Sequence, residues 1–317
     1  HSLVQQDNLL GLGDQWLVAH SRSFGGELEA SSVQVTVPWG LVGPTVGLNV
    51  THSSLQLPNS ANAQGQVGDF TAWKAFVNHK ALRTRNHTVQ VVGSLEWRRL
   101  SALPSDVYRD NRELQVQAVS ATGDHRDAWA GGGLSTWALE LRSGQLDRSV
   151  PVISGHSTQL QASATRLQTW VPRQWLLYGS LRAQLTTHAL DPSLQCSLGG
   201  PSGVKGYGLG LPLADECVST SAELRFVLPK RWLGAWVGQG ITVGAYWDKG
   251  WARRNSTAAP GSDFRQAIHL DTLGVRAVWI HSKQVSAELL VSEQVGDRSP
   301  WLDSEHSKVL GAVRWAF

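Results

Sequence analysis

One stretch of the chain carries residues suited to a specific interaction. Leu198-Gly-Gly-Pro-Ser-Gly-Val-Lys-Gly-Tyr207 is rich in glycine, holds a single cation at Lys205 and lies between the only two cysteines, Cys196 and Cys217. A phosphate-binding loop also combines glycines with a lysine, but it continues as Gly-Lys-Ser/Thr and opens a helix. Here Gly-Val-Lys-Gly-Tyr is followed by a strand-like segment, so we expect no nucleotide at this loop.

The other reactive residue types show no catalytic or metal-binding spacing. The 11 histidines form neither H-E-x-x-H nor H-x-x-E-H, and two cysteines are too few for a zinc site. No G-x-S-x-G elbow is present to hold a nucleophilic serine. The net charge is +3, but the basic residues are scattered and form no stripe with stacking aromatics, which argues against nucleic acid. We expect no enzyme, no cofactor, no metal and no nucleic-acid partner.

The elements that must position the glycine-rich stretch repeat with a period of two. Near the C-terminus, Val309, Val313 and Trp315 share one face of a segment, and Lys308 and Arg314 share the other. Such alternation is typical of strands that are covered on one face. Fifteen segments show it: 1–7, 15–24, 30–38, 44–56, 66–79, 87–99, 110–121, 130–142, 157–169, 174–188, 218–228, 240–251, 266–280, 284–294 and 307–317.

Hydropathy excludes membrane-spanning helices but permits a membrane barrel. No window of about 18 or more apolar residues exists, which a transmembrane helix needs. Strands of a transmembrane barrel alternate lipid-facing and lumen-facing residues, so their average stays close to that of a soluble protein. The mean hydropathy of −0.19 is compatible with such strands.

The connections between the segments differ in length on the two sides of the predicted sheet. Tight connections include Asn8–Asp14, Pro38–Pro44, Val171–Arg173 and Ile280–Lys283. Longer connections include 57–65, 100–109, 143–156, 189–217, 252–265 and 295–306. Short turns on one side and long loops on the other are expected of outer-membrane barrels.

Side-chain types on the two faces favour the same class. A soluble sandwich also alternates, but its polar face usually carries Lys, Thr and Ser, whereas this polar face repeatedly carries isolated Arg and Glu. We expect those charges to pair across a wet lumen: Glu96, Arg98, Glu140, Arg182, Glu223, Arg225, Arg276, Glu288 and Arg314. Many of the 15 tryptophans lie in or near strand-like segments and suit interfacial belts: Trp73, Trp97, Trp137, Trp175, Trp247, Trp279 and Trp315. The sequence therefore predicts an all-β, transmembrane antiparallel barrel.

The count of fifteen segments is odd, whereas bacterial single-chain barrels have even strand numbers because lipid tolerates no unpaired edge. The first segment is also short. We expect a native barrel of sixteen strands, of which about fifteen are present in this chain and one lies before His1.

At this point the chain resembles the TpsB transporters of two-partner secretion, the haemolysin secretion/activation group of the Omp85 superfamily. The resemblance covers essentially the whole chain and rests on the order and spacing of short pieces. These pieces are the turn Asp7-Asn-Leu-Leu-Gly-Leu-Gly-Asp14, the loop Leu198–Tyr207, the strand Ala222-Glu-Leu-Arg225, the segment Tyr246-Trp-Asp-Lys-Gly250 and the last strand ending on Phe317.

The resemblance implies a gating loop and a matching motif on the barrel wall. The family pattern V-R-G-Y/F corresponds to Val204, Lys205, Gly206 and Tyr207, and F-x-D-x-G corresponds to Tyr246, Asp248 and Gly250. It implies that the loop folds back into the lumen and that Lys205 pairs with Asp248, which the alternation also turns inward. Lys replaces Arg here, and a compact ammonium holds a carboxylate less rigidly than a planar guanidinium fork. The alternative places Lys205 on a solvated loop tip.

The two cysteines are candidates for a disulfide at the base of this loop. Cys196 would close the ascending strand and Cys217 would open the next one, and adjacent antiparallel strands bring such positions together. The cell surface is oxidising, which permits the bond. The alternative is a pair of buried free thiols.

These observations lead to an expected function. Residues 1–317 are expected to form the translocation barrel domain alone, without the first strand and without the POTRA domains that precede the barrel in this family, since no βααβ-like segment is present. We expect an outer-membrane pore of a Gram-negative bacterium, a monomer in lipid, that secretes a large exoprotein of the adhesin or haemolysin type from periplasm to cell surface. The alternatives are an Omp85-type assembly barrel, a soluble all-β binding module and, least favoured, a passive porin.

Overall fold

A computed structural model describes residues 2–22, 28–40, 43–55, 67–102, 110–148, 155–171, 174–191, 193–200, 203–208, 213–232, 238–255, 267–295 and 306–315. Within these ranges the regular structure is almost entirely β. Two 3₁₀ turns, η1 (Trp129–Gly131) and η2 (Lys230–Trp232), lie in connections between strands. None of the helices found in the described part of the chain is long and apolar enough to cross a membrane.

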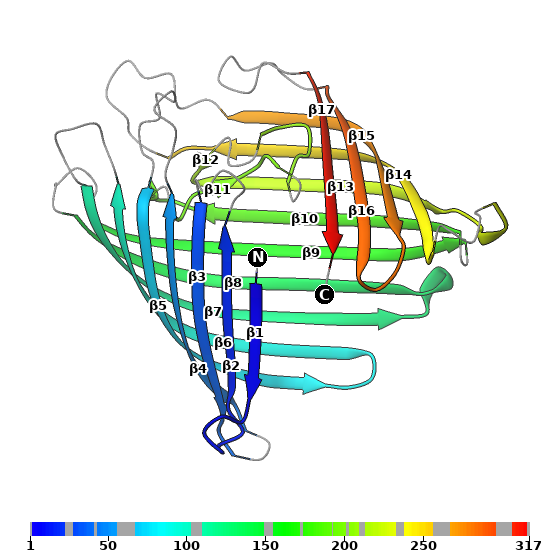
Figure 1. The fold of residues 1–317 in the computed structure, drawn as a ribbon. Coiled ribbons are helices and arrows are strands. Elements are labelled where there is room, and N and C mark those ends of the chain that lie inside the picture. The colour runs from blue at the N-terminus through cyan, green and yellow to red at the C-terminus, as the bar shows by residue number, and fades with distance from the viewer. Residues whose placement is uncertain are drawn as a thin grey trace. The chain divides into compact units, whose positions relative to one another are not determined.

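Fifteen strands form one sheet in which neighbours in sequence are neighbours in space (Figure 1). Among the described strands, the order skips in sequence only from β10 to β13, because the intervening β11 and β12 form a separate two-stranded sheet. The main-sheet strands are β1 (Ser2–Asp7), β2 (Gln15–Arg22), β3 (Leu28–Pro38), β4 (Thr45–Leu55), β5 (Val67–Arg83), β6 (His87–Ala102), β7 (Asp110–Asp127), β8 (Gly133–Arg148), β9 (Gly155–Val171), β10 (Trp175–Thr186), β13 (Glu216–Val227), β14 (Gly240–Arg253), β15 (Ile268–Ile280), β16 (Val285–Gln294) and β17 (Ser307–Trp315).

The predicted fold class and the fifteen predicted segments are confirmed among the described residues. The sixteenth strand stays a prediction. The prediction of where three strands end was wrong, since β5, β7 and β8 run to Arg83, Asp127 and Arg148 instead of 79, 121 and 142. The tail of β7, Ala121-Thr-Gly-Asp-His-Arg-Asp127, is mostly polar and shows no apolar alternation. Only pairing with neighbouring strands keeps such a polar tail extended.

The connections follow the predicted asymmetry only in part. The expected loops 100–109 and 143–156 are shorter than predicted, since β6 ends at Ala102, β8 ends at Arg148 and β9 begins at Gly155. The connection from β13 to β14 is on the side of the sheet where short turns are expected. It is nevertheless long, since it spans 228–239 and contains η2. The predicted loop 57–65 and the last two residues of the predicted strand 307–317 lie outside the described residues, as does most of the predicted turn Val171–Arg173.

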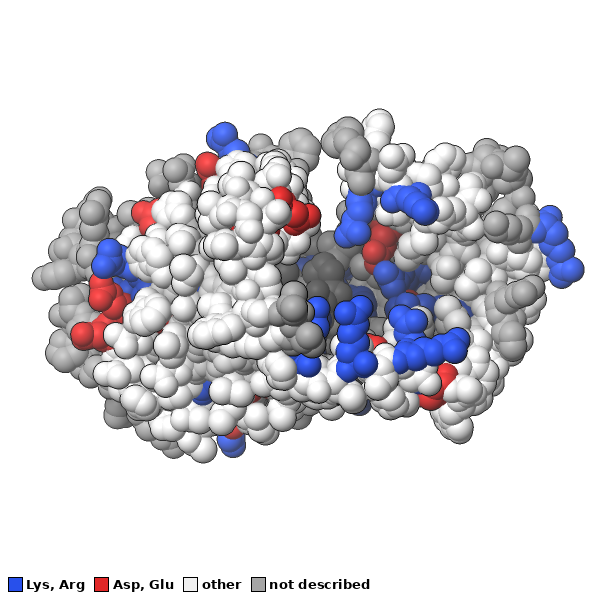
Figure 2. Space-filling model, turned by 90° about the horizontal axis from the view of Figure 1, so that it is seen from below, with Lys and Arg blue, Asp and Glu red and all other residues white. Residues whose placement is uncertain are grey.

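The two faces of the strands differ as the alternation predicts. In β17, Val309, Val313 and Trp315 are 67, 78 and 69% exposed. In β14, Trp247 is exposed, whereas its neighbour Asp248 is buried on the opposite face. Large areas of the surface that Figure 2 shows carry no Lys, Arg, Asp or Glu. One face of the strands is therefore apolar and open to the surroundings.

Charged residues on the other face pair along a strand, with the adjacent strand or with the next strand but one, as Arg166 of β9 does with Asp127 of β7. The prediction of pairing across a lumen was wrong for the pairs that the structure describes. Arg98 binds Glu96 within β6, and Arg225 binds Glu223 within β13, with N–O distances of 2.7 Å in both pairs. Arg276 of β15 binds Glu288 of β16. Residues i and i+2 of a strand share a face, so opposite charges at that spacing meet without crossing any space.

The turn between β1 and β2 is held by the Asp14 side chain. Asp14 is 1% exposed, and its carboxylate accepts hydrogen bonds from the backbone N–H groups of Leu10 and Leu12 and from the indole N–H of Trp16. Asn8 adopts a positive φ of 57° and accepts a bond from the Gly13 amide. Burial alone would raise the pKa of Asp14, but these donors outweigh it and hold the pKa below its usual value.

The chain divides into two compact units. One comprises His1–Arg83, Thr88–Thr122 and Glu140–Gln159, and the other comprises Thr84–His87, Gly123–Leu139 and Leu160–Phe317. The glycine-rich stretch, both cysteines and the strands from β10 onward belong to the second unit. Every residue of the candidate site therefore lies in one unit.

Candidate functional site

The glycine-rich stretch lies in the connection between two paired strands, β10 and β13. These strands are antiparallel neighbours, with Trp175 opposite Phe226 and Gln184 opposite Cys217. Within the connection, β11 (Cys196–Ser197) pairs with β12 (Leu213–Ala214). The two short strands form a stem, and the described residues between them, 198–200 and 203–208, form the tip.

The tip has its own backbone hydrogen bonds. The Val204 amide donates to the Leu198 carbonyl at 2.7 Å, and the Gly200 amide donates to the Tyr207 carbonyl at 3.1 Å. Gly200 has a φ of +100°, a conformation that residues with a side chain rarely adopt. Lys205 directly follows Val204, so these backbone hydrogen bonds fix the conformation of the turn that carries Lys205.

Apolar side chains dock the tip against strands β14 and β15. Leu198, Val204 and Tyr207 are each at most 2% exposed and pack in one cluster with Ala252 of β14 and Leu270 of β15. Burial of this kind stabilises each large aliphatic side chain by roughly 1.5–3 kcal/mol. The cluster holds the tip against the sheet independently of charge.

Two glycines make this close approach possible. A Cβ on Gly250 of β14 would lie 2.8 Å from Val204 Cγ2, and a Cβ on Gly206 would lie 2.6 Å from Thr272 Oγ1. The Gly206 carbonyl also accepts a bond of 2.8 Å from the Gln294 side-chain amide of β16. Glycine is required at both positions because backbone and side chain meet there without room for a methyl group.

Lys205 forms an ion pair with Asp248 at the centre of the docked tip. Lys205 Nζ lies 2.9 Å from Oδ1 and 3.0 Å from Oδ2 of Asp248, and the Lys205 backbone N–H donates to Oδ2 at 3.1 Å. The Asp248 side chain is 0% exposed and that of Lys205 is 12% exposed. A carboxylate so removed from water needs such donors, because burying an unpaired charge is strongly unfavourable.

Two further side chains complete the surroundings of the ammonium group. Ser221 of β13 donates to Asp248 Oδ1 at 2.6 Å and accepts a bond of 3.2 Å from Lys205 Nζ. The ring centroid of Tyr246 lies 4.3 Å from the same nitrogen, within the range of a cation–π interaction. The Tyr246 hydroxyl is hydrogen-bonded to Ser292 Oγ at 2.5 Å, which fixes the ring from the far side.

The structure brings together all seven motif residues expected from the sequence. The contributors that the sequence did not predict include Ser221, Thr272 and Gln294. Strand register places all three: Ser221 and Thr272 lie opposite Asp248 on its two neighbouring strands, and Thr272 in turn lies opposite Gln294. Ser, Thr and Gln are common residue types, and these three belong to no sequence motif. Only the register of the paired strands identifies them as part of this site.

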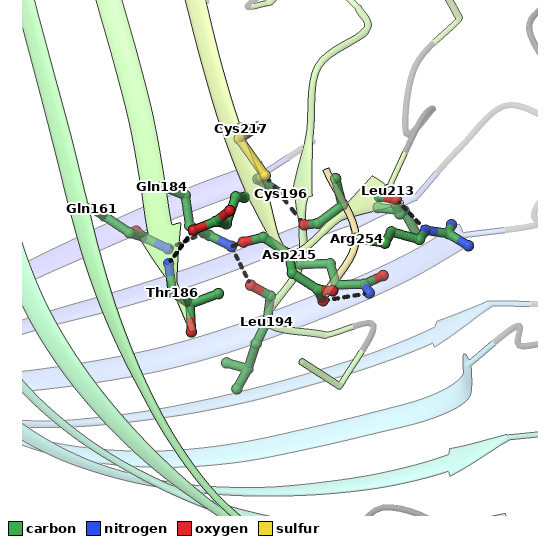
Figure 3. The surroundings of a disulfide bond; sticks show 12 residues. Gln161, Gln184, Thr186, Leu194, Cys196, Leu213, Asp215, Cys217 and Arg254 are labelled. Atoms are coloured by element: carbon green, nitrogen blue, oxygen red, sulfur yellow. Dashed lines mark hydrogen bonds between the residues drawn. A yellow bond between two sulfur atoms is a disulfide. The ribbon is translucent and has the colours of Figure 1, made fainter. Parts of the chain in front are cut away.

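The disulfide between Cys196 and Cys217 is present, with a Cα–Cα distance of 6.4 Å, and it is shown in Figure 3. The expectation that Cys196 closes the ascending strand was wrong. β10 already ends at Thr186, and Cys196 lies in the stem strand β11 inside the loop. The bond therefore joins the stem of the loop to the first residues of β13.

A buried carboxylate holds the same stem without covalent bonding. Asp215 is 0% exposed and accepts hydrogen bonds from the backbone N–H groups of Leu190 and Asn255 and from the side chain of Gln195. Gln184 of β10 donates to the carbonyls of Leu194 and Asp215, as Figure 3 shows. These hydrogen bonds tie the stem to β10 and to the residues after β14. The tip has no covalent tie of its own among the described residues.

Comparisons with known proteins identify the family and the fold of the chain. A family profile described as "Haemolysin secretion/activation protein ShlB/FhaC/HecB" matches residues 2–271. No individual curated protein sequence matches the chain.

Solved structures share the fold at low sequence identity. CdiB from Escherichia coli superposes with a TM-score of 0.74 at 20% identity over 99% of this chain and 59% of that chain. CdiB from Acinetobacter baumannii gives 0.66 at 14% identity over 99% of this chain and 55% of that chain. BamA from Haemophilus ducreyi lacking POTRA domains 1–3 gives 0.70 at 12% identity, over 98% and 66%.

The chain spans a little over half the length of the CdiB structures. The structural likeness establishes a β-barrel fold, and the profile match extends over most of the sequence. The chain belongs to the haemolysin secretion/activation family, ShlB/FhaC/HecB, whose members are β-barrel proteins of the Gram-negative outer membrane.

Proposed function

We propose that this barrel is the translocation pore of a two-partner secretion system. It passes one large, unfolded exoprotein of the adhesin or haemolysin type from the periplasm to the cell surface. Membership of the haemolysin secretion/activation family supports the transport class, and the docked loop tip supports a gated pore. An extended chain moving through a wet, charged lumen needs no nucleotide, and folding of the exoprotein outside biases the movement outward.

We propose further that the loop between β10 and β13 is the gate. The single observation that carries this role is the buried Lys205–Asp248 ion pair, which joins the tip to the strand wall. A passive diffusion pore has no need for an ion pair that ties a loop to the wall. Opening requires the tip to leave its apolar cluster and the ion pair to break, while the disulfide and Asp215 keep the stem in place.

The second candidate function is an assembly barrel for other outer-membrane proteins. The similarity of the fold to that of BamA supports this candidate. Deleting the full-length gene separates the two functions. Loss of one secreted exoprotein from the culture medium, with normal amounts of the other outer-membrane proteins, supports secretion. A general loss of outer-membrane proteins with normal secretion contradicts it.

The gate is tested in the same full-length protein by Asp248→Ala. We expect more frequent and longer open events in planar-bilayer recordings, together with altered exoprotein secretion. Lys249→Gln is the matched control, since Lys249 lies on the same strand and pairs with Asp271 in an exposed position. Unchanged conductance and secretion in Asp248→Ala would exclude the loop as the gate.

A further inference from the structure

The apolar face of four neighbouring strands, β13 to β16, contains a groove of about 510 Å³. This volume lies within the range of small-molecule sites. These strands run side by side in the second unit (Figure 1). The groove lies on the face opposite to the loop tip, because Val243 and Ala245 alternate along β14 with Tyr246 and Asp248.

Strand register explains why this surface is hollow. The floor consists of smaller side chains on the two central strands, Val243 and Ala245 of β14 and Val275 and Ala277 of β15, which lie opposite one another. The walls are at least as large, since they consist of Leu, Phe and Val whereas the floor includes two alanines. Leu224 and Phe226 of β13 flank one side, and Leu289 and Val291 of β16 flank the other, each in register with a floor residue. Small side chains between rows of large ones leave an apolar trough.

Trp175 and Phe226 line one end of the trough, and the neighbouring 3₁₀ turn η2 supplies a further aromatic ring and a cation. Trp175 lies opposite Phe226, with ring centroids 4.7 Å apart, and Trp232 in η2 lies 6.1 Å from Phe226. The guanidinium of Arg231 lies 6.0 Å from the Trp232 ring centroid. Tryptophan is enriched where a membrane meets water, and an arginine fork matches the oxygens of a phosphate. Among the described residues, none that lines the trough is acidic.

We propose that this trough is a binding site for one glycerophospholipid. One acyl chain lies along the floor between the rows of β13 and β16, the glycerol region meets Trp175 and Trp232, and the phosphate binds Arg231. The charge of Arg231 and its place next to the interfacial aromatics distinguish a lipid from a peptide or a second copy of the barrel. The site is independent of the proposed transport function, since it lies on the face away from the loop.

The test compares lipid binding by variants of the purified, full-length protein. Protein stripped of lipid in detergent is titrated with phosphatidylglycerol, and native mass spectrometry counts the bound molecules. Ala245→Leu/Ala277→Leu fills the floor with residues that suit a lipid-facing surface, so folding is retained. Ala222→Leu, an exposed change on β13 outside the trough, is the matched control. Arg231→Gln removes the phosphate ligand, and Arg231→Lys retains its charge.

We expect the wild type and Ala222→Leu to bind one lipid with the same affinity. The filled-floor variant should bind at least tenfold more weakly, and Arg231→Gln several-fold more weakly than Arg231→Lys. Equal binding by the filled-floor variant and the wild type would overturn the site, as would a wild type that binds no lipid. Equal binding by Arg231→Gln and the wild type would overturn the headgroup assignment. Heat-modifiable migration confirms that each variant is folded.

Discussion

Removing either partner of the Lys205–Asp248 ion pair should release the loop tip. The informative changes are Asp248→Asn and Lys205→Gln, which keep side-chain size and remove charge, together with the double variant. Each single change leaves the other partner buried and uncompensated, since Asp248 is 0% and Lys205 12% exposed. Lys205→Arg preserves the charge and should keep the tip docked.

The size of the effect follows from the geometry. At an Nζ–O distance of 2.9 Å, the direct Coulomb term is about 6 kcal/mol for an effective dielectric constant of about 20. Dehydration of both groups opposes this term, and breaking a buried pair by removing one partner costs about 3–5 kcal/mol. Since about 1.4 kcal/mol corresponds to a factor of ten, the open population of the tip should rise roughly 10²- to 10⁴-fold.

Amide hydrogen exchange of the barrel in lipid nanodiscs measures that population. The Lys205 amide itself donates to Asp248 Oδ2, so its exchange reports the contact directly. Peptides covering 203–208 should lose protection in each single variant. The double variant should lose far less than the product of the two single effects, because the interacting groups are no longer independent. Lys249→Gln should leave this segment unchanged, since an exposed pair contributes about 0–1 kcal/mol.

Two results would refute the reasoning. If both single variants keep wild-type protection at the Lys205 amide, the apolar cluster alone holds the tip and the ion pair is not a latch. If the two single effects multiply in the double variant, the two side chains act separately, and the coupling inferred from their 2.9 Å contact is wrong.

Three further predictions concern the tip, the stem and the first turn. Gly206→Ala should raise amide exchange of the tip and destabilise its docking by about 1–3 kcal/mol. Gly179→Ala should do neither, since no atom lies within 4 Å of the new methyl group, and equal exchange in the two variants would contradict the close packing at Gly206. Reducing the Cys196–Cys217 disulfide should lower the free energy of unfolding by about 3 kcal/mol in denaturant titrations. Amide exchange of the tip should rise less than it does in Asp248→Asn, and a fully released tip would show that the disulfide holds it. The lowered pKa of Asp14 means that its stabilising effect is present above pH 3.8 and is lost as the pH falls through the folded pKa. Asp14→Asn should therefore lower the thermal midpoint at neutral pH, with a deficit that shrinks in acid, and a deficit independent of pH would contradict this assignment.

Much of the fold was predictable because a strand in this barrel is defined by a local pattern. In β14, Trp247 and Asp248 are neighbours in sequence and lie on opposite faces, as a period of two requires. The ends of the strands were less predictable. The polar tail of β7 up to Asp127 shows no apolar alternation, so only hydrogen bonding to adjacent strands makes it extended.

The candidate site was predictable where a motif carries it. Family resemblance singled out Lys205 and Asp248, and alternation along the strand turned Asp248 to the same face as Tyr246. The position of Cys196 was not predictable in the same way. The stem strands β11 and β12 are only two residues long each, and their pairing depends on how the whole loop packs.

The sequence by itself determined the strands, their faces and the seven motif residues, because these depend on residue type and spacing within short segments. The tertiary structure decided which residues surround the ion pair and how the loop is anchored. Ser221 and Gln294 contact the loop from β13 and β16, and Asp215 binds the stem of the loop to Asn255 after β14. Strand register and loop packing bring these residues together. The phospholipid trough arises in the same way: its small floor and large walls come from four strands, so no single segment reveals the hollow.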